Sequence, residues 1–330
     1  MRILIVNTGI IPVHLYGGTE RVIWGLGKEL AQLGHEVTFL VRSGSSCDFA
    51  SVLFIDENKP IVDQIPERFD IVHFNFQPDQ LERVTTPYIV TIHGNSNNPE
   101  ETFDRNAVFV SKNHAYRFQS ESYVLNGLDW SDYTQPDLDI KRNYFHFLGK
   151  AAWRVKNVKG AIDVVKAANG EKLKVLGGVR FNFEMGMRFT FSPKIGFEGM
   201  VGGEKKDRLL NGSKGLIFPI RWHEPFGLAI IESLYYGCPV FGTPYGSLPE
   251  LVNDEVGFLS NKQSELTEAI QQVESYSIQH CHEYARDRFN SKRMTLDYVK
   301  KYEQVLNGET LSPTTPQLRK KQDEKYLDWS

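Results

Sequence analysis

Two glutamates, Glu224 and Glu232, stand eight residues apart in the stretch RWHEPFGLAIIESLYYGCPVFG. The apolar run after Glu224 predicts a helix, and Pro225 suits its first position because the N–H that proline lacks is unpaired there in any helix. The residues that follow offer unpaired backbone N–H groups, which favour an anion, while carboxylates accept hydrogen bonds from hydroxyl groups. The pattern therefore indicates a pocket for a phosphorylated sugar compound, with N–H groups from Phe226, Gly227 and Leu228.

An ordinary amphipathic helix, with one glutamate buried and the other exposed, is the alternative interpretation of this stretch. Glu232 lies within the apolar run LAIIESLYYG, about two turns into the predicted helix. A carboxylate in such a run is poorly placed for a merely solvated role, since buried charges need partners. We therefore favour the binding pocket.

A second candidate is the basic segment FLGKAAWRVKNVKGA, which follows a predicted strand at 144–148. Arginine and lysine both bind phosphate, the first as a fork and the second as a point charge. The alternative is an exposed basic helix start, but cations there oppose the helix dipole. The placement favours a polyanion contact by some of its four cations, Lys150, Arg154, Lys156 and Lys159.

The N-terminal part of the chain offers a histidine and a glycine pair. His93 ends an apolar strand in TIHGN, where active-site residues collect in open parallel sheets, although a plain structural histidine is the alternative. Gly17 and Gly18 precede a predicted helix and let the backbone approach a ligand closely. A tight turn without a ligand explains the pair equally well, and the dinucleotide fingerprint G-x-G-x-x-G is absent here.

Strands and helices alternate through most of the chain, which predicts a doubly wound parallel α/β fold. The first series has strands at 2–7, 36–41, 52–55, 70–75, 88–93 and 107–111, with helices at 19–33 and 112–119. Gly34 fits the end of the first helix as a C-cap. The polar, turn-rich residues 126–143 resemble an interdomain connection.

The second series begins with the strand at 144–148 and adds an irregular hairpin at 181–191. Its other predicted elements are strands at 172–176, 215–219 and 239–242 and helices at 158–168, 204–211, 263–274, 278–289 and 291–306. We predict an N-terminal domain at 1–140, a C-terminal domain at 141–305 and a mobile or docked tail at 306–330. Two Rossmann-like domains of this kind would bind ligands in the cleft that they face.

Composition excludes several classes of protein. A net charge of -3 over 330 residues argues against an obligate nucleic-acid binder. No apolar run approaches a membrane span, and MRILIVNTG lacks the form of a signal peptide. The scattered cysteines, Cys47, Cys238 and Cys281, suit a reducing cytoplasm. Neither His280 and His282, on different helix faces, nor Asp137-x-Asp139, in the polar linker, predicts a metal site.

Several motifs together resemble the retaining glycosyltransferases of family 4, which have the GT-B fold. Glu224-Pro225-Phe226-Gly227 with Glu232 reproduces the E-x7-E motif of that family. Other matches are Gly17-Gly18-Thr19-Glu20, Gly34-His35-Glu36-Val37, Asn126-Gly127-Leu128-Asp129, Gly237-Cys238-Pro239-Val240 and Gly246-Ser247-Leu248-Pro249-Glu250. The resemblance covers roughly residues 1–305. Each motif alone is weak, but their combined order is specific.

The resemblance implies a nucleotide-diphosphate-sugar donor, held mainly by the C-terminal domain and used without cofactor or metal. Glu232 would bind the ribose hydroxyls and Glu224 the donor sugar, with backbone N–H groups of residues 226–228 around sugar and diphosphate. Arg154 and Lys159 would neutralise the diphosphate. His93 would touch the donor sugar near the reacting carbon, and Gly17 and Gly18 would face the phosphates and the acceptor.

One departure from the family pattern concerns those cations. The family motif G-R-x4-K-G has arginine directly after glycine, whereas Lys150 follows Gly149 here. The R-x4-K spacing survives as Arg154 to Lys159, so we carry over that pair, and Lys150 or Lys156 remains an alternative for either role.

The expected function is a retaining sugar transferase acting on a sugar or lipid-linked acceptor, in surface polysaccharide or glycolipid assembly. A GT-B-type nucleotide-sugar epimerase and a catalytically inactive sugar-nucleotide-binding protein are the alternatives. We expect a cytoplasmic protein, and peripheral contact with the inner face of the membrane stays open.

Overall fold

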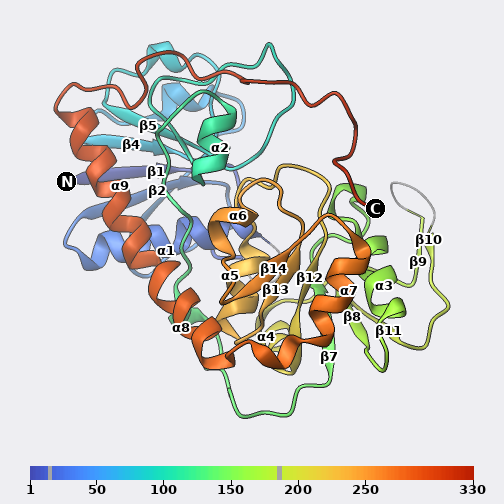
Figure 1. The fold of residues 1–330 in the computed structure, drawn as a ribbon. Helices are drawn as coiled ribbons and strands as arrows, with labels where there is room; N and C mark the ends of the chain where they lie inside the picture. Colours follow the sequence, from blue (N-terminus) through green and yellow to red (C-terminus); the bar gives the residue numbers. More distant parts are fainter. Residues whose placement is uncertain (14–16, 184–187) are drawn as a thin grey trace. The chain divides into compact units, whose positions relative to one another are not determined.

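The computed structural model describes residues 1–13, 17–183 and 188–330, which fall into two compact units (Figure 1). Unit 1 comprises residues 1–13, 17–129 and 289–322, and the described part of unit 2 comprises 130–288 and 323–330. The division differs from the predicted boundaries because the chain returns to unit 1 at Phe289 and to unit 2 at Asp323. The segment at 291–306, predicted as part of the C-terminal domain, therefore belongs to unit 1.

Unit 1 is built on a parallel sheet with strand order β3-β2-β1-β4-β5-β6. Its central strands read as continuous apolar runs, as expected for a sheet covered on both faces. The elements are β1 (Arg2–Val6), α1 (Gly18–Gln32), β2 (Glu36–Val41), β3 (Ser51–Phe54), η1 (Ile61–Gln64), β4 (Ile71–Phe74), η2 (Leu81–Arg83), β5 (Tyr88–Ile92), β6 (Ala107–Phe109), α2 (Lys112–Arg117) and α9 (Ser291–Leu306). Gly34, with a φ of 84°, follows the end of α1 as the sequence predicted.

The last helix of unit 1, α9, packs on the sheet through buried tyrosines. His73 in β4 bonds the Tyr302 hydroxyl at 2.8 Å and the Thr91 hydroxyl at 2.7 Å. Thr91 also bonds Tyr298 at 3.0 Å. Hydrogen bonds satisfy the polar atoms that the core buries here, so the same contacts fix α9 against β4 and β5.

The chain enters α9 alongside the Asn126-Gly127-Leu128-Asp129 motif. Leu128 N–H donates to Phe289 O, and Ser291 N–H donates to Leu128 O. A Cβ on Gly127 would lie 2.1 Å from the Asn290 carbonyl oxygen. The glycine is therefore explained by backbone packing inside unit 1.

Unit 2 repeats the same plan around a second parallel sheet, in the order β11-β8-β7-β12-β13-β14. Counted without the β9–β10 hairpin, both sheets follow the Rossmann strand order 3-2-1-4-5-6. The elements are η3 (Trp130–Asp132), β7 (Tyr144–Leu148), η4 (Arg154–Lys156), α3 (Val158–Ala167), β8 (Leu173–Leu176), β9 (Phe181–Asn182), β10 (Arg188–Phe189), β11 (Ile195–Gly199), α4 (Gly203–Asn211), β12 (Ser213–Phe218), α5 (Leu228–Tyr235), β13 (Val240–Gly242), α6 (Leu248–Leu251), β14 (Gly257–Leu259), α7 (Gln263–Gln271), η5 (Val273–Ser275) and α8 (Ile278–Arg288). The α/β fold with two parallel sheets confirms the predicted fold class.

In unit 2, two results differ from the predicted elements and one agrees with them. Strands β11 and β14 were not predicted, because short runs containing glycine carry little strand signal. The predicted hairpin at 181–191 is present as the antiparallel pair β9–β10, and residues 184–187 lie outside the described residues. Helix α5 begins at Leu228 rather than at Pro225, since Gly227 adopts a left-handed conformation with a φ of 90°.

The predicted tail at 306–330 is docked along the chain. Phe103 N–H donates to Pro316 O, and Gln317 N–H donates to Phe118 O, both within unit 1. In unit 2, Leu327 N–H donates to Arg221 O and Arg221 Nε donates to Leu327 O at 2.7 Å. Among the described residues, no helix is long and apolar enough to cross a membrane.

Candidate active site

The turn that carries Glu224 is fixed by the loop after β13. Ser247 N–H donates to Glu224 O at 3.0 Å, and Ser247 Oγ donates to Phe226 O at 2.5 Å. Gly246 has a φ of 62°, and a Cβ there would lie 2.3 Å from Glu224 N. The Gly246-Ser247 pair thus holds the Glu224 backbone just before α5, which is a structural reason for that motif.

Glu224 is paired with Lys156 inside unit 2. The Lys156 ammonium lies 2.5 Å from Glu224 Oε2, and the side chains are only 13% and 9% exposed. Trp222 Nε1 donates to the same carboxylate oxygen at 2.9 Å. The Lys156 ammonium also lies 5.0 Å from the Trp222 ring centroid. One oxygen thus receives two donors, so the carboxylate is oriented at the start of α5.

Lys156 reaches this position because the loop after β7 is bonded to the loop after β12. Arg221 N–H donates to Val155 O at 2.7 Å. Asn157 Nδ2 donates to Pro219 O at 2.9 Å, while Asn157 Oδ1 caps α3 by accepting from Gly160 N–H. Asn157, which has a left-handed backbone conformation with a φ of 53°, lies between the turn that holds Lys156 and α3. The chain direction therefore changes between Lys156 and Lys159.

Lys159, which the spacing argument selected, lies elsewhere. It sits in the first turn of α3, is 80% exposed and pairs with Asp163 at 2.8 Å. Arg154 is exposed in the short helix η4. The structure therefore brings Lys156, one of the alternatives, to Glu224, and it does not bring Lys159 there.

Glu232 is buried in α5 with two partners of its own. Its Oε1 accepts from the Tyr133 hydroxyl at 2.9 Å and from the Lys206 ammonium of α4. Glu232 is 3% exposed and Lys206 is 7% exposed. Trp130 stacks on Tyr235 with ring centroids 4.2 Å apart and covers the same helix. Glu232 is thus bonded to the buried Lys206 and to Tyr133, which lies near the start of residues 130–288 of unit 2.

In unit 1, His93 follows the carboxyl end of β5. Its Nε2 lies 3.0 Å from Asn75 Oδ1, at the end of the neighbouring strand β4. Burial lowers the pKa of His93 to about 4, so the ring is neutral at pH 7. An amide oxygen only accepts, so Nε2 carries the proton and Nδ1 is left as an acceptor. A neutral, oriented imidazole at a strand end can bind a sugar hydroxyl.

Gly17 and Gly18 begin α1, with Gly17 as its N-cap. A Cβ on Gly17 would lie 2.7 Å from Glu20 Oε2, and one on Gly9 would lie 2.5 Å from Glu20 Oε1. Glu20 is also the acidic residue of the first turn, where it complements the helix dipole. This close approach supports the tight-turn interpretation. The phosphate contact predicted for Gly17 and Gly18 remains a prediction.

Four further side chains belong to these clusters but were not among the predicted site residues. Their residue types alone do not mark them as site residues, since a lysine or tyrosine can be recognised as part of a buried cluster only when its partner is known. Trp222 lies two residues before Glu224, and Tyr133 lies four residues after Asp129. Their closeness to these motifs is the signal in the sequence that could have indicated them. The four are Asn75, Tyr133, Lys206 and Trp222.

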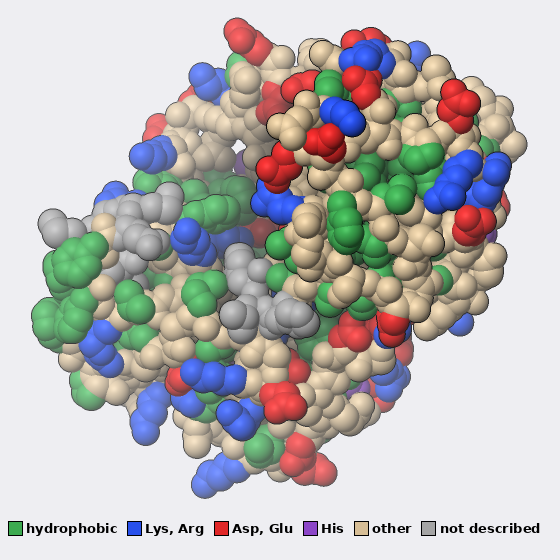
Figure 2. Space-filling model, turned by 180° about the vertical axis from the view of Figure 1, so that it is seen from behind, with side chains coloured by type: hydrophobic (Ala, Val, Ile, Leu, Met, Phe, Trp, Pro, Cys, Tyr) green, Lys and Arg blue, Asp and Glu red, His purple; other side chains and the backbone are tan. Residues whose placement is uncertain are grey.

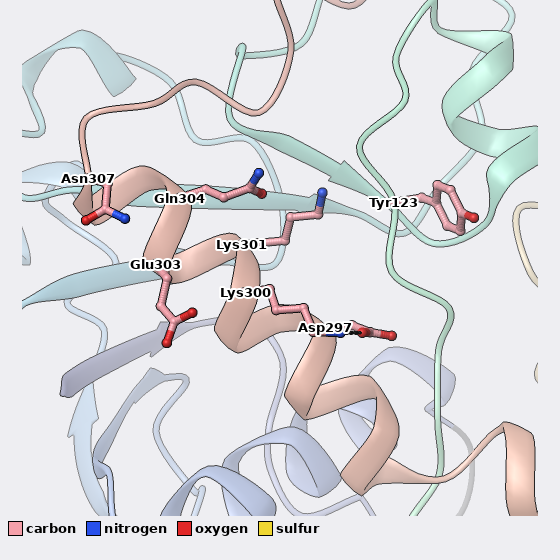
Figure 3. A pocket seen from close by; sticks show the side chains of 7 residues that line it. All are labelled: Tyr123, Asp297, Lys300, Lys301, Glu303, Gln304 and Asn307. Carbon is pink, nitrogen blue, oxygen red and sulfur yellow. Dashed lines mark hydrogen bonds and ion pairs between the residues drawn. The ribbon is translucent and has the colours of Figure 1, made fainter.

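A separate cavity of about 590 Å³ lies along α9 in unit 1 (Figure 3). The Lys300–Asp297 ion pair, at 2.7 Å, lies on its wall. Its lining is polar and contains none of the predicted site residues: Tyr123, Asp297, Lys300, Lys301, Glu303, Gln304 and Asn307. Within the described ranges, no three His, Cys, Asp or Glu side chains are grouped to hold a metal ion.

The clusters around Glu224 and Glu232 lie in a part of the chain that is similar to known proteins. Residues 132–288 match the family described as glycosyl transferases group 1. An uncharacterized 41.2 kDa protein in the cps region of Klebsiella pneumoniae is 33% identical over 95 residues, which is 26% of this chain and 26% of that protein. The match thus spans about a quarter of the curated relative.

Solved structures resemble the fold over nearly the whole chain. AviGT4, a glycosyltransferase involved in avilamycin A biosynthesis, has a TM-score of 0.74 at 21% identity, covering 94% of this chain and 99% of its own. Anabaena HepE in complex with UDP and glucose has a TM-score of 0.64 at 16% identity, covering 92% and 99%. At these identities the likeness establishes the fold.

The two Rossmann-like sheets and these neighbours define a protein of the GT-B class. Within this fold, the match to glycosyl transferases group 1 covers residues 132–288, a little less than half of the chain. The matched stretch contains both glutamates, Lys156 and Lys206. The predicted resemblance is therefore confirmed.

Proposed function

We propose that this protein transfers a sugar from a nucleotide-diphosphate-sugar donor to a hydroxyl acceptor, with retention of configuration and without a metal ion. The observation that carries the proposal is the Lys156–Glu224 pair, with Trp222, directly before α5. The pair supports the proposal because a cation and a carboxylate, which can accept hydrogen bonds from hydroxyl groups, lie together at the start of a helix. Support also comes from the group 1 match over 132–288 and from HepE, which was solved with UDP and glucose.

In the proposed reaction, the bond between the anomeric carbon and the diphosphate oxygen breaks, and its electron pair leaves with the diphosphate. The acceptor hydroxyl oxygen forms the new bond on the same face, and its proton passes to the departing diphosphate. Lys156 and Arg154 stabilise the growing negative charge, which is where preorganised cations help most. Glu224 binds hydroxyls of the donor sugar, and Glu232 binds the ribose.

The cations explain why the proposal needs no metal ion. A charge-assisted hydrogen bond contributes about 1.5–3 kcal/mol, and two such groups beside a helix start can carry much of the leaving-group charge. His93 and the glycine turn of unit 1 contribute to binding of the substrates. The acceptor is a sugar or a lipid-linked sugar of surface polysaccharide assembly, a suggestion that the cps-region relative supports.

A donor screen followed by a transfer assay tests the proposal. Nucleotide sugars are first ranked by thermal stabilisation, since a ligand at 100 times its dissociation constant adds about 2.7 kcal/mol to the unfolding free energy. The best donor, labelled in its sugar, is then incubated with hydroxyl acceptors in the presence of a chelator. We expect label in the acceptor, the anomeric configuration of the donor in the product, and at least ~10-fold slower transfer by Glu224→Gln.

Other outcomes would assign the protein differently. Isomerisation of the donor without an acceptor would indicate an epimerase. Tight donor binding without turnover would indicate a binding protein. Loss of transfer with the chelator, restored by a divalent cation, would contradict the metal-free part of the proposal.

A further inference from the structure

The β9–β10 hairpin is a two-stranded sheet of its own, and it lies in the connection between two strands of the main sheet of unit 2. Strands β8 and β11 are parallel neighbours, and such strands are usually joined through a helix that covers one face of the sheet. Here residues 177–194 make that connection, and the regular structure of their described part, 177–183 and 188–194, consists of β9 and β10. Figure 1 shows these two strands on the side of unit 2 where β8 and β11 lie. The hairpin thus stands where a crossover helix is expected.

The pairing register gathers the hairpin's apolar side chains on one face. Phe181 lies opposite Phe189, so residues two positions away along either strand share their face. The Phe181 ring contacts both Phe189 and Phe191, with centroids 6.0 and 5.7 Å apart. The Phe183 and Phe189 rings are 5.7 Å apart. These rings form a continuous aromatic surface on the hairpin, here called the Phe face.

The Phe face is exposed to solvent. Exposure is 53% for Val179, 46% for Phe181, 69% for Phe183, 49% for Phe189 and 80% for Phe191. Figure 2 shows hydrophobic side chains gathered beside the grey residues at the left of the view. Contiguous exposed apolar patches on soluble proteins mark binding sites, whereas single exposed residues are ordinary.

The opposite face of the hairpin is fastened to unit 2. Arg180 donates from Nη1 to Thr190 O at 2.9 Å and from Nη2 to Ile195 O at 2.7 Å. Its guanidinium carbon also lies 5.7 Å from the Phe197 ring centroid of β11. Because Arg180 alternates with the Phe residues along the strand, these bonds hold the Phe face outward.

The segment around the Phe face is basic. At the two ends of residues 172–194, Lys172 is exposed and Lys194 is half-buried. Lys174 instead pairs with Glu198 at 3.7 Å, and Arg180 bonds the backbone on the opposite face of the hairpin. Leu173 N–H donates to Lys194 O at 2.9 Å, which places Lys172 beside Lys194. Lys194 in turn reaches Ala168 O at 3.0 Å, near the exposed Lys166. Aromatic residues flanked by lysines match an anionic, apolar partner.

We propose that the Phe face is a membrane-contact site that inserts into a lipid surface with anionic headgroups. Phenylalanine rings enter the acyl boundary, while flanking lysines meet the headgroup phosphates. A second copy of the chain would bring Lys166, Lys172 and Lys194 toward the same lysines of its partner, which opposes self-association through this face. The proposal does not depend on the transfer reaction, although a lipid-linked acceptor would be found at the same surface.

Vesicle co-sedimentation of the whole protein tests the site. Vesicles contain either phosphatidylglycerol with phosphatidylethanolamine, or phosphatidylcholine alone. We expect wild-type protein to bind the anionic vesicles, with weaker binding at high salt and on phosphatidylcholine. Phe183→Asp/Phe191→Asp should bind at least ~10-fold more weakly, because burying each ring contributes a factor of about ten or more. Lys172→Glu should weaken only the salt-dependent part.

The matched control is Phe54→Asp in β3 of unit 1, which removes another 55% exposed phenylalanine and should bind like wild type. Equal vesicle binding by the hairpin variant and this control would overturn the proposal, as would no binding by wild type. Wild-type dimers in light scattering that the hairpin variant abolishes would assign the face to self-association instead. If the double variant fails to fold, Phe191→Asp alone, at the 80% exposed position, gives the same comparison.

Discussion

At the residue scale, the two glutamates in the stretch that matches group 1 differ in the cations that they contact. Glu224 lies against Lys156 with side chains 9% and 13% exposed, and Glu232 lies against Lys206 with side chains 3% and 9% exposed. Removing two charges from water costs free energy, and a buried pair recovers that cost only with good geometry and further hydrogen bonds. Tyr133 and Trp222 supply those further bonds. Both carboxylates are therefore paired with a cation and oriented before any ligand binds.

A double-mutant cycle measures the deeper pair. Glu232→Ala and Lys206→Ala should each lower the free energy of unfolding by about 3–5 kcal/mol, since each removes one partner of a buried ion pair. The double variant should lose clearly less than the sum of the two. Guanidinium unfolding provides the values, and Lys159→Ala, which breaks an exposed pair, should change stability by less than ~1 kcal/mol. Additive losses would show that the two charges do not interact.

At the element scale, α5 is held at both ends of its short length. At its start, the Gly246-Ser247 loop fixes the backbone of residues 224–226, which lead into α5. Further along, His146 of β7 bonds Ser213 at 2.7 Å and Ser233 of α5 at 2.8 Å. Ser233 Oγ donates to Ala229 O, so His146 Nε2 is the donor to Ser233. The buried imidazole therefore joins α5 to two strands of the sheet in its neutral form.

The neutrality of His146 predicts a pH dependence of stability. Burial lowers the pKa of His146 to about 3, below the ordinary value of 6.5. The unfolded chain then binds a proton that the folded chain does not, so stability is complete above about pH 6.5 and falls as the pH drops toward 3. Between pH 7 and pH 5, His146 should account for a loss of about 2 kcal/mol in unfolding free energy.

Urea unfolding of wild type and His146→Gln at pH 7 and pH 5 checks this value. His146→Gln should be less stable than wild type at pH 7. Between pH 7 and pH 5, its unfolding free energy should fall by about 2 kcal/mol less than that of wild type. His280→Gln, at a position where 42% of the side chain is exposed, is the control and should lose as much as wild type. An equal acid loss in all three proteins would contradict the assignment.

At the scale of the whole molecule, the apolar runs were sufficient to predict two parallel α/β sheets. The return of α9 to unit 1 was not predictable, because its pattern is that of any amphipathic helix. Tyr298 and Tyr302 become informative only once His73, more than 200 residues earlier, is known to bond one of them. The sequence did not decide between a mobile and a docked tail for a related reason: backbone bonds such as Leu327 to Arg221 leave no trace in residue type.

The candidate site was predicted best where chemistry and chain position coincide. Glu224 and Glu232 are recognisable from their spacing alone. The lysine that pairs with Glu224 is not, because the R-x4-K spacing favours Lys159, whereas the left-handed Asn157 separates the turn that holds Lys156 from α3. The backbone conformation of Asn157 thus decides which lysine contacts Glu224. The residue type alone predicts such a conformation only weakly.

The measurement that tests the account most directly compares sugar transfer by Lys156→Ala and Lys159→Ala, using the donor and acceptor found in the screen. Loss of a charge-assisted contact to the departing diphosphate should slow Lys156→Ala by ~10- to 100-fold or more. Lys159→Ala should transfer at nearly the wild-type rate, with donor affinity unchanged. The opposite ranking, or equal rates for both variants, would contradict a donor site built around Lys156 and Glu224.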